Sequence, residues 1–139
     1  MSDIGRLCEF ADDFLLKMHA PATGKEARQV FQHVIKHSDT GIVVVAKHKT
    51  GICAYAYASY EWRSEFGGET LHCVELYVEP AWRNKGVASR LLATLIDTAK
   101  ERGIRRISAE VHPGNSTIER ILESCGFDPE HRTIWARQL

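Results

Sequence analysis

Residues 78–89 read Val78-Glu79-Pro80-Ala81-Trp82-Arg83-Asn84-Lys85-Gly86-Val87-Ala88-Ser89. The residues before Pro80 favour a β-strand, and apolar residues recur at helical spacing after Gly86. A basic turn therefore leads from a strand into a long helix. The first backbone amides of a helix have no partner inside it, and the helix dipole is positive at that end. This segment is therefore suited to bind an anion such as a phosphate. With one glycine and no Gly-Lys-Ser/Thr, it matches neither a P-loop nor a dinucleotide fingerprint.

The sequence before this segment predicts two helices and three strands. The helices cover residues 4–18 and 23–37, and the second opens with the capping box Thr23-Gly24-Lys25-Glu26. Strands at 42–46 and 52–60 form a hairpin through the turn Lys49-Thr50-Gly51, and a third strand covers 69–78. The hairpin and the loop after it carry aromatic residues that either pack the core or line a binding site: Tyr55, Tyr57, Tyr60, Trp62 and Phe66.

The sequence after this segment predicts alternating helices and strands. A helix at 87–99 ends before Gly103, and a β-rich stretch at 104–111 follows it. Next we expect a turn at Pro113-Gly114 and a helix at 116–125 that opens with a capping box from Ser116 to Glu119. A closing strand is expected at 133–139. This order of elements predicts one α/β (α+β) domain over residues 1–139, with mixed strand pairing.

Composition excludes several classes of protein. The chain has 139 residues, and 18 Lys+Arg balance 18 Asp+Glu, so neither nucleic acid nor an anionic membrane is expected as the main partner. No apolar run approaches the ~20 residues of a membrane span, and the first residues do not resemble a signal peptide. Four scattered cysteines predict reduced thiols and a cytoplasmic location. No metal site is expected, because His33 and His37 lack a third ligand.

Two motifs resemble those of the GNAT superfamily of N-acetyltransferases. The first is Arg83-x-x-Gly86-x-Ala88 after a strand that ends in Leu76-Tyr77-Val78. The second is Asn115, followed by a short helix and Cys125-Gly126-Phe127. The resemblance covers roughly residue 42 to the C-terminus. It implies a mixed, mostly antiparallel central sheet with flanking helices, and acetyl-CoA as co-substrate.

The resemblance also implies which residues bind acetyl-CoA. The amides from about Lys85 to Ser89 would hold the pyrophosphate, and the backbone of Leu76 to Val78 would pair with the pantetheine arm. The amide of Val78 or its neighbour would polarise the thioester carbonyl. Asn115 would hydrogen-bond the pantetheine region. The implied binding residues are Leu76, Val78, Arg83, Asn84, Lys85, Gly86, Val87, Ala88, Ser89 and Asn115.

N-acetyl transfer requires a neutral amine, so a carboxylate that takes its proton is useful. Glu75 and Tyr77 lie two apart on the third strand, hence on one face, beside the implied thioester position. We predict Glu75 as the base, with Glu110 and His112 as alternatives. Many members of the superfamily place a tyrosine in the second motif to protonate the leaving thiolate, and that position here is Leu122. Tyr77, His112 or a water would then replace it.

The N-terminal part departs from the superfamily pattern, because the helical spacing begins at Ile4 and the usual opening strand is reduced or absent. An uncovered sheet edge would result, and a homodimer is one way to cover it. The leading hypothesis is an N-acetyltransferase that acts on a primary amine of a small molecule or peptide. The alternatives are a catalytically weak acetyl-CoA-binding sensor or partner module, and an anion or nucleotide binder that shares only the helix-start loop.

Overall fold

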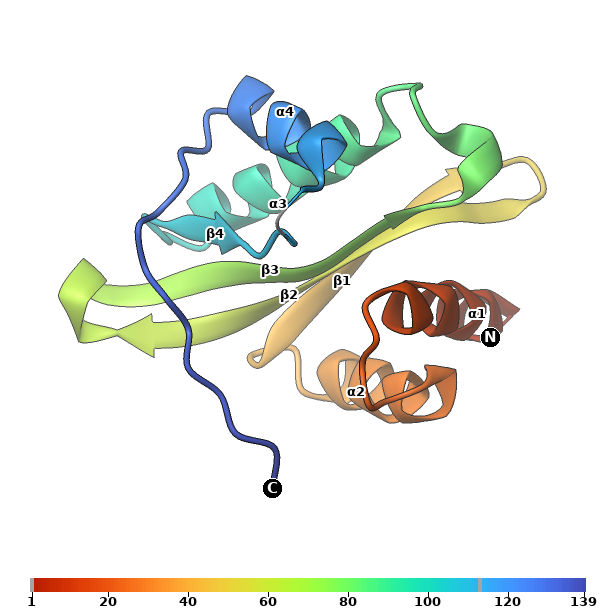
Figure 1. The fold of residues 1–139 in the computed structure, drawn as a ribbon, viewed down its shortest axis with the longest axis horizontal. Coiled ribbons are helices and arrows are strands. Elements are labelled where there is room, and N and C mark those ends of the chain that lie inside the picture. The colour runs from red at the N-terminus through yellow and green to blue at the C-terminus, as the bar shows by residue number, and fades with distance from the viewer. Residues whose placement is uncertain (1, 113) are drawn as a thin grey trace.

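The computed structural model describes residues 2–112 and 114–139, and Figure 1 shows its fold. The elements follow the predicted order up to the last helix. They are α1 (Ser2–Lys17), α2 (Gly24–Lys36), β1 (Gly41–His48), β2 (Gly51–Arg63), the 3₁₀ turn η1 (Ser64–Phe66), β3 (Gly68–Val78), the 3₁₀ turn η2 (Pro80–Trp82), α3 (Val87–Glu101), β4 (Ile107–Ala109) and α4 (Ser116–Ser124). Pro113, part of the predicted Pro113-Gly114 turn, lies outside the described residues.

The strands form one sheet in the order β1-β2-β3-β4. β1 pairs with β2 and β2 with β3 in antiparallel fashion, whereas β3 pairs with β4 in parallel. The predicted mixed, mostly antiparallel sheet with flanking helices is therefore confirmed. The parallel pair is short and joins Leu71–Cys73 to Ile107–Ala109. β3 thus has a neighbour on both sides at its start and on one side only at its end.

The alternation of tyrosine and alanine along β2 explains the two layers of helices. Because successive side chains of a strand point to opposite faces, Tyr55 packs with α1 and α2, whereas Ala54 and Ala56 face α3. Figure 1 shows α1 and α2 on one side of the sheet and α3 on the other, with α4 beside it. The small alanines leave room for Leu95 of α3, which is fully buried. Replacing such a leucine by alanine costs roughly 2–5 kcal/mol.

The start of α2 is fixed by contacts that the sequence predicted. Thr23 caps the helix: its hydroxyl accepts from the amide of Lys25 at 3.3 Å, and its own amide donates to Glu26 Oε2 at 2.9 Å. Gly24 is pressed against α1, where an added Cβ would lie 2.6 Å from the carbonyl oxygen of Cys8. The amide of Gly24 also donates to Asp12 Oδ1 at 2.8 Å. The capping box therefore sets the helix start and the packing of α1 on α2 together.

Two sequence predictions about the C-terminal part are wrong. Residues 133–139 form no strand, and Trp135 is 91% exposed. The segment before them is held at the tip of the β2–β3 hairpin, because Arg132 pairs with Glu65 at 2.9 Å and Glu130 pairs with Arg106. The capping box of α4 is also wrong. Its N-cap is Asn115, one residue earlier than predicted, because the Asn115 side chain accepts from the amide of Ile118.

The first described element is α1, and no strand precedes it among the described residues. β1 is an edge strand of the described sheet, so the homodimer stays a prediction that a single chain does not test. None of the described helices combines the length and the apolar character that crossing a bilayer requires.

Candidate active site

The second half of β3 has an unpaired edge. The last link between β3 and the chain at the end of β4 is the hydrogen bond from the Glu110 amide to the Cys73 carbonyl, at 3.3 Å. Beyond Cys73, β3 pairs only with β2. The amide of Glu79 donates to Cys53 of β2 at 2.9 Å, so by alternation the backbone groups of Leu76 and Val78 face away from β2. This edge can accept an extended ligand as an added strand.

A bulge separates the two halves of β3. Tyr57 is opposite Glu75, but Ala58 is opposite Cys73, which leaves Val74 without a partner on β2. A bulge bends a strand and increases its twist. Cys73 packs in the cluster under α3, whereas Glu75, two residues later, bonds to Tyr55 on the other face. The bulge therefore brings Glu75 onto the face that carries α1, next to the unpaired edge.

The start of α3 presents unpaired amides. Gly86 is the N-cap with φ 79°, no side chain caps the helix, and an added Cβ would have no heavy atom within 4 Å. Asn84 also has a positive φ, 61°. The amides of Val87, Ala88 and Ser89 occupy the first turn, where an α-helix supplies no internal acceptor. The predicted phosphate-binding segment is thus open at its backbone and adjoins the end of β3.

Two cations lie beside this helix start. Arg83 Nε donates to the Val78 carbonyl at 2.8 Å, and its guanidinium lies 5.6 Å from the ring centre of Tyr77. Lys85 Nζ lies 5.2 Å from the ring centre of Trp82. Both side chains are exposed and can turn toward a phosphate. Arg83 joins the two predicted binding segments, the edge of β3 and the turn before α3.

Glu75 is half-buried and hydrogen-bonded. The hydroxyl of Tyr55 donates to Glu75 Oε1 at 2.7 Å. Burial raises the pKa of Glu75, and the hydrogen bond from Tyr55 partly opposes that rise. Burial beside Glu75 also raises the pKa of Tyr55, which therefore stays a proton donor. A carboxylate whose pKa is raised toward neutrality is a better base than an exposed one.

Tyr77 shares a face with Glu75, as predicted, but its hydroxyl is engaged elsewhere. It donates to Asp13 Oδ2 of α1 at 2.7 Å. Burial and this hydrogen bond raise the pKa of Tyr77 to about 12. The hydrogen bonds from Tyr77 and Lys17 lower the pKa of Asp13. The hydroxyl of Tyr77 therefore ties β3 to α1 instead of pointing toward the unpaired edge.

Sequence reasoning missed a group of three polar side chains at the β3–β4 junction. His72 Nδ1 lies 2.6 Å from Ser108 Oγ, and His72 Nε2 lies 2.7 Å from Glu110 Oε1. Only Glu110 was predicted, as an alternative base; His112, the other alternative, is exposed beyond β4. The parallel register that places His72 opposite Ser108 has no signature in the sequence, so no local pattern reveals this group.

The second motif supplies an N-cap and an apolar side chain. Asn115 Oδ1 accepts from the amide of Ile118 at 3.3 Å, which gives Asn115 a structural role. Leu122 is 8% exposed and contributes no proton donor where the superfamily pattern places a tyrosine. Among residues 2–112 and 114–139, no three His, Cys, Asp or Glu side chains gather as a metal site.

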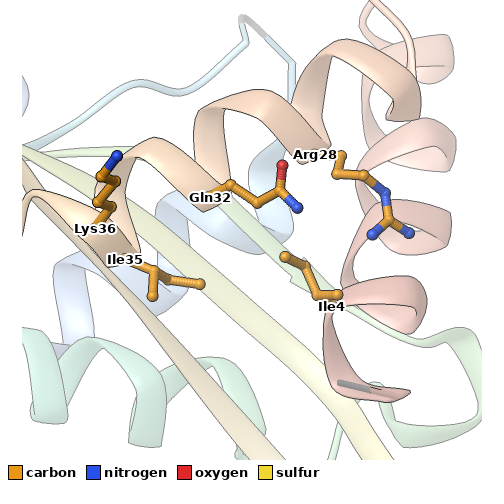
Figure 2. Close-up of a pocket in the computed structure, with 5 residues that line it drawn as sticks. All are labelled: Ile4, Arg28, Gln32, Ile35 and Lys36. Atoms are coloured by element: carbon orange, nitrogen blue, oxygen red, sulfur yellow. The ribbon is translucent and has the colours of Figure 1, made fainter.

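A cleft of about 410 Å³ lies away from these residues, between α1 and α2. Figure 2 shows its lining: Ile4 comes from α1, and Arg28, Gln32, Ile35 and Lys36 come from α2. None of the predicted binding or catalytic residues lines it. The predicted residues on β3 and at the start of α3 therefore lie outside this cleft.

Comparison with known proteins gives a consistent result. The family described as Acetyltransferase (GNAT) family matches residues 7–127. An aminoglycoside N(6')-acetyltransferase type 1 of Salmonella typhimurium is 27% identical over 63 residues, 45% of this chain and 43% of the relative. An L-methionine sulfoximine/L-methionine sulfone acetyltransferase of the same species is 33% identical over 88 residues, 63% of this chain and 51% of the relative. The chain thus spans about half the length of these curated relatives.

A solved structure has the same fold. It is a predicted acetyltransferase with acetyl-CoA from Clostridium acetobutylicum, and it superposes with a TM-score of 0.80 over 98% of this chain and 90% of that chain. Sequence identity is 20%, so the likeness concerns the fold alone.

Proposed function

Because this chain belongs to the GNAT family of acetyltransferases, we propose that it transfers an acetyl group from acetyl-CoA to a primary amine of a small molecule or peptide. The observation that carries this proposal is the unpaired edge of β3, which leads through η2 and the basic turn to the uncapped start of α3. The first suits an extended polar arm, and the second suits a phosphate group. Acetyl-CoA combines these two features in one molecule.

The start of α3 would bind the pyrophosphate. Amides from Lys85 to Ser89 would donate to its oxygens, with Arg83, Asn84 and Lys85 around them. The open space at Gly86 supports this assignment, because a ligand can approach the backbone closely there. From this point the pantetheine arm would run along β3 toward Cys73, with Leu76 and Val78 as backbone partners. The amide of Val78 or of its neighbour on the unpaired edge would polarise the thioester carbonyl, and Asn115 would hydrogen-bond the pantetheine arm.

Glu75 would accept the proton that the attacking amine must lose. The neutral nitrogen would then attack the thioester carbon directly, with no covalent enzyme intermediate. Burial of Glu75 and its contact with Tyr55 support this role. Tyr77 stays a prediction as the second catalytic residue, and it would have to exchange its hydrogen bond to Asp13 before it could reach the sulfur.

The relatives support an amine acceptor without identifying it, because their names combine an aminoglycoside with amino acid derivatives. We place the reaction in the cytoplasm, where acetyl-CoA is available. All four cysteines are unpaired, which supports a reducing compartment.

The alternative is a catalytically weak acetyl-CoA-binding sensor or partner module. The buried Leu122 favours it, because that position lacks the hydroxyl that would protonate the leaving thiolate. Loss of a general acid lowers rates by roughly 10²–10⁴-fold. A binding module would retain the edge of β3 and the start of α3 but would release no thiol in the presence of an amine.

Calorimetric titration with acetyl-CoA, with ATP as the comparison, tests the binding step. We expect micromolar affinity for acetyl-CoA and weaker binding of ATP. Absence of acetyl-CoA binding would overturn the proposal. Thiol release from acetyl-CoA is then measured with kanamycin and with L-methionine sulfone, and the acetylated amine is identified by mass spectrometry. Binding without amine-dependent thiol release would favour the sensor or partner module.

Glu75→Gln tests the base, with Glu79→Gln as the matched control. Glu79 lies four residues further along the chain, and its carboxylate pairs with Arg6 at 2.6 Å. We expect Glu75→Gln to lower turnover most at low pH, where the amine is mostly protonated. Glu79→Gln should keep the wild-type pH profile. Equal profiles for all three proteins would remove Glu75 as the base.

A further inference from the structure

His72, Ser108 and Glu110 form a continuous hydrogen-bonded chain. His72 and Ser108 are directly opposite in the parallel register of β3 and β4. The imidazole lies between the other two side chains, 2.6 Å from Ser108 Oγ and 2.7 Å from Glu110 Oε1. The side chain of His72 is 19% exposed and that of Glu110 is 52% exposed. Glu110, at one end of this hydrogen-bonded chain, is therefore in solvent, and Ser108, at the other end, is half-buried.

The chemistry of the three groups fixes the direction of the hydrogen bonds. An ionised carboxylate only accepts, so Nε2 of His72 carries a hydrogen and donates it to Glu110. In the neutral ring, Nδ1 then accepts the hydroxyl hydrogen of Ser108. A free lone pair of Ser108 Oγ can accept a proton, while His72 takes up the hydroxyl hydrogen. Glu110 stabilises the resulting imidazolium, as a carboxylate does for a catalytic histidine.

The hydrogen-bonded chain of Ser108, His72 and Glu110 lies where the unpaired edge of β3 begins, next to Cys73. Leu71 and Cys73 of β3 and Ile107 and Ala109 of β4 pack toward α3. The alternating residues His72 and Ser108 therefore face the opposite side of the sheet, the side toward which Glu75 also points. β3 and β4 part directly after Cys73, where the Glu110 amide makes the last link. In the proposed function, on which this inference rests, the pantetheine arm runs along the unpaired edge toward this point and carries its thioester at the leading end.

When acetyl transfer releases CoA, its thiolate sulfur needs a proton. The second motif does not supply a donor at the position where the superfamily pattern places a tyrosine. Leu122 has no hydroxyl, and the hydroxyl of Tyr77 is held by Asp13 at 2.7 Å. We propose that Ser108, His72 and Glu110 carry the proton of the attacking nitrogen to the thioester sulfur.

The steps balance as follows. When the N–C bond forms, the nitrogen gives a proton to Ser108 Oγ, and Ser108 passes its hydroxyl hydrogen to Nδ1 of His72. When the C–S bond breaks, the electron pair moves to sulfur, sulfur takes a proton from Ser108, and Nδ1 returns one to Ser108. The products are the acetamide and the free thiol, and Ser108, His72 and Glu110 return to their initial protonation.

The test compares donors with different leaving groups. Turnover of kanamycin or L-methionine sulfone is measured with acetyl-CoA and with 4-nitrophenyl acetate, whose phenolate leaves without a proton. We expect His72→Gln to lower kcat with acetyl-CoA by about 10²-fold or more. With 4-nitrophenyl acetate only the proton of the attacking nitrogen still needs these side chains, so the ratio of wild-type to variant rate should be clearly smaller than with acetyl-CoA. Equal losses with both donors would overturn the proposal and leave His72 a structural role.

Two further comparisons separate chemistry from folding. Ser108→Ala should behave as His72→Gln, whereas Ser108→Thr, which keeps a hydroxyl on the strand, should restore most of the turnover. If Ser108→Thr were as impaired as Ser108→Ala, the proton path through Ser108 would be wrong. His33→Gln, an exposed histidine of α2, is the matched control and should match the wild type.

Calorimetry with acetyl-CoA on every variant checks that the binding site has folded. A variant that binds normally and keeps full turnover contradicts the proton path. A wild type that binds acetyl-CoA and acetylates neither amine contradicts the proposed function instead.

Discussion

Tyr55 on β2 donates its hydroxyl hydrogen to Glu75 on β3, with 2.7 Å between Tyr55 Oη and Glu75 Oε1. The tyrosine is fully buried, and its ring lies edge-on against Phe31 of α2, with 5.7 Å between the ring centres. The donor is therefore fixed by the core, while the carboxylate is half-buried beside the unpaired edge of β3. Core packing and the candidate base are thus connected by one hydrogen bond.

Tyr55→Phe should raise the pKa of Glu75 further. The hydroxyl stabilises the ionised carboxylate, so its removal leaves burial unopposed. A higher pKa means that the base is ionised only at higher pH, so the acidic limb of the kcat/KM profile should move to higher pH. Tyr60→Phe, on the same strand but beside Arg102, is the control and should leave the limb in place. A limb that stays fixed in Tyr55→Phe would show that Glu75 does not govern the profile.

Glu75→Gln should make the protein more stable than the wild type at pH 8 and not at pH 4.5. Burial raises the pKa of Glu75 above its unfolded value, so the folded state favours the protonated acid. As the pH rises from the unfolded-state pKa of Glu75 through its folded-state pKa, the wild type loses stability. The Glu75→Gln variant, whose side chain stays neutral, does not. Thermal unfolding across this range measures the difference. Glu101→Gln, at the exposed end of α3, controls for the lost charge. A stability difference between Glu75→Gln and the wild type that stays the same from pH 4.5 to pH 8 would contradict the prediction.

The elements that the sequence predicted correctly depend on local signals. The capping box at Thr23 and Glu26 lies within four residues, and the alternation in β2 is visible in the sequence itself. The uncapped start of α3 was also expected, because the basic residues, the glycine and the helical spacing adjoin one another. Such signals depend on neighbours along the chain. The predicted elements form in the structure because the tertiary contacts favour the same local conformations.

The parts that the sequence did not reveal depend on register. The unpaired Val74 shifts β3 by one residue, and only that shift places Glu75 and His72 on one face. Nothing in the sequence around Val74 marks the bulge. The closing strand failed for a related reason: residues 133–139 pair with no strand, and Arg132, directly before them, binds the hairpin tip at Glu65. Contacts between distant residues decided both outcomes.

Gly86→Asp should abolish measurable acetyl-CoA binding, and Gly86→Asn is its matched control. Both residues must adopt φ 79°, which costs an L-residue roughly 1–2 kcal/mol and is tolerated best by Asn and Asp. A Cβ added at Gly86 has no heavy atom within 4 Å, so both variants should fold. They differ in charge, and only the aspartate repels a pyrophosphate. Calorimetry should show partial loss for Asn and complete loss for Asp; equal affinities would remove the pyrophosphate from this site.

Asn115 has a structural role and a predicted binding role, and two substitutions separate them. Asn115→Asp keeps an oxygen that can cap α4 and adds negative charge at a helix start, so the melting temperature should not fall. Asn115→Ala removes the cap at a cost of about 1 kcal/mol and should lower it. Both variants lack the side-chain NH₂ group. If that group donates to the pantetheine arm, both should bind acetyl-CoA more weakly than the wild type. If Asn115→Asp binds acetyl-CoA with wild-type affinity, then Asn115 serves only as the N-cap.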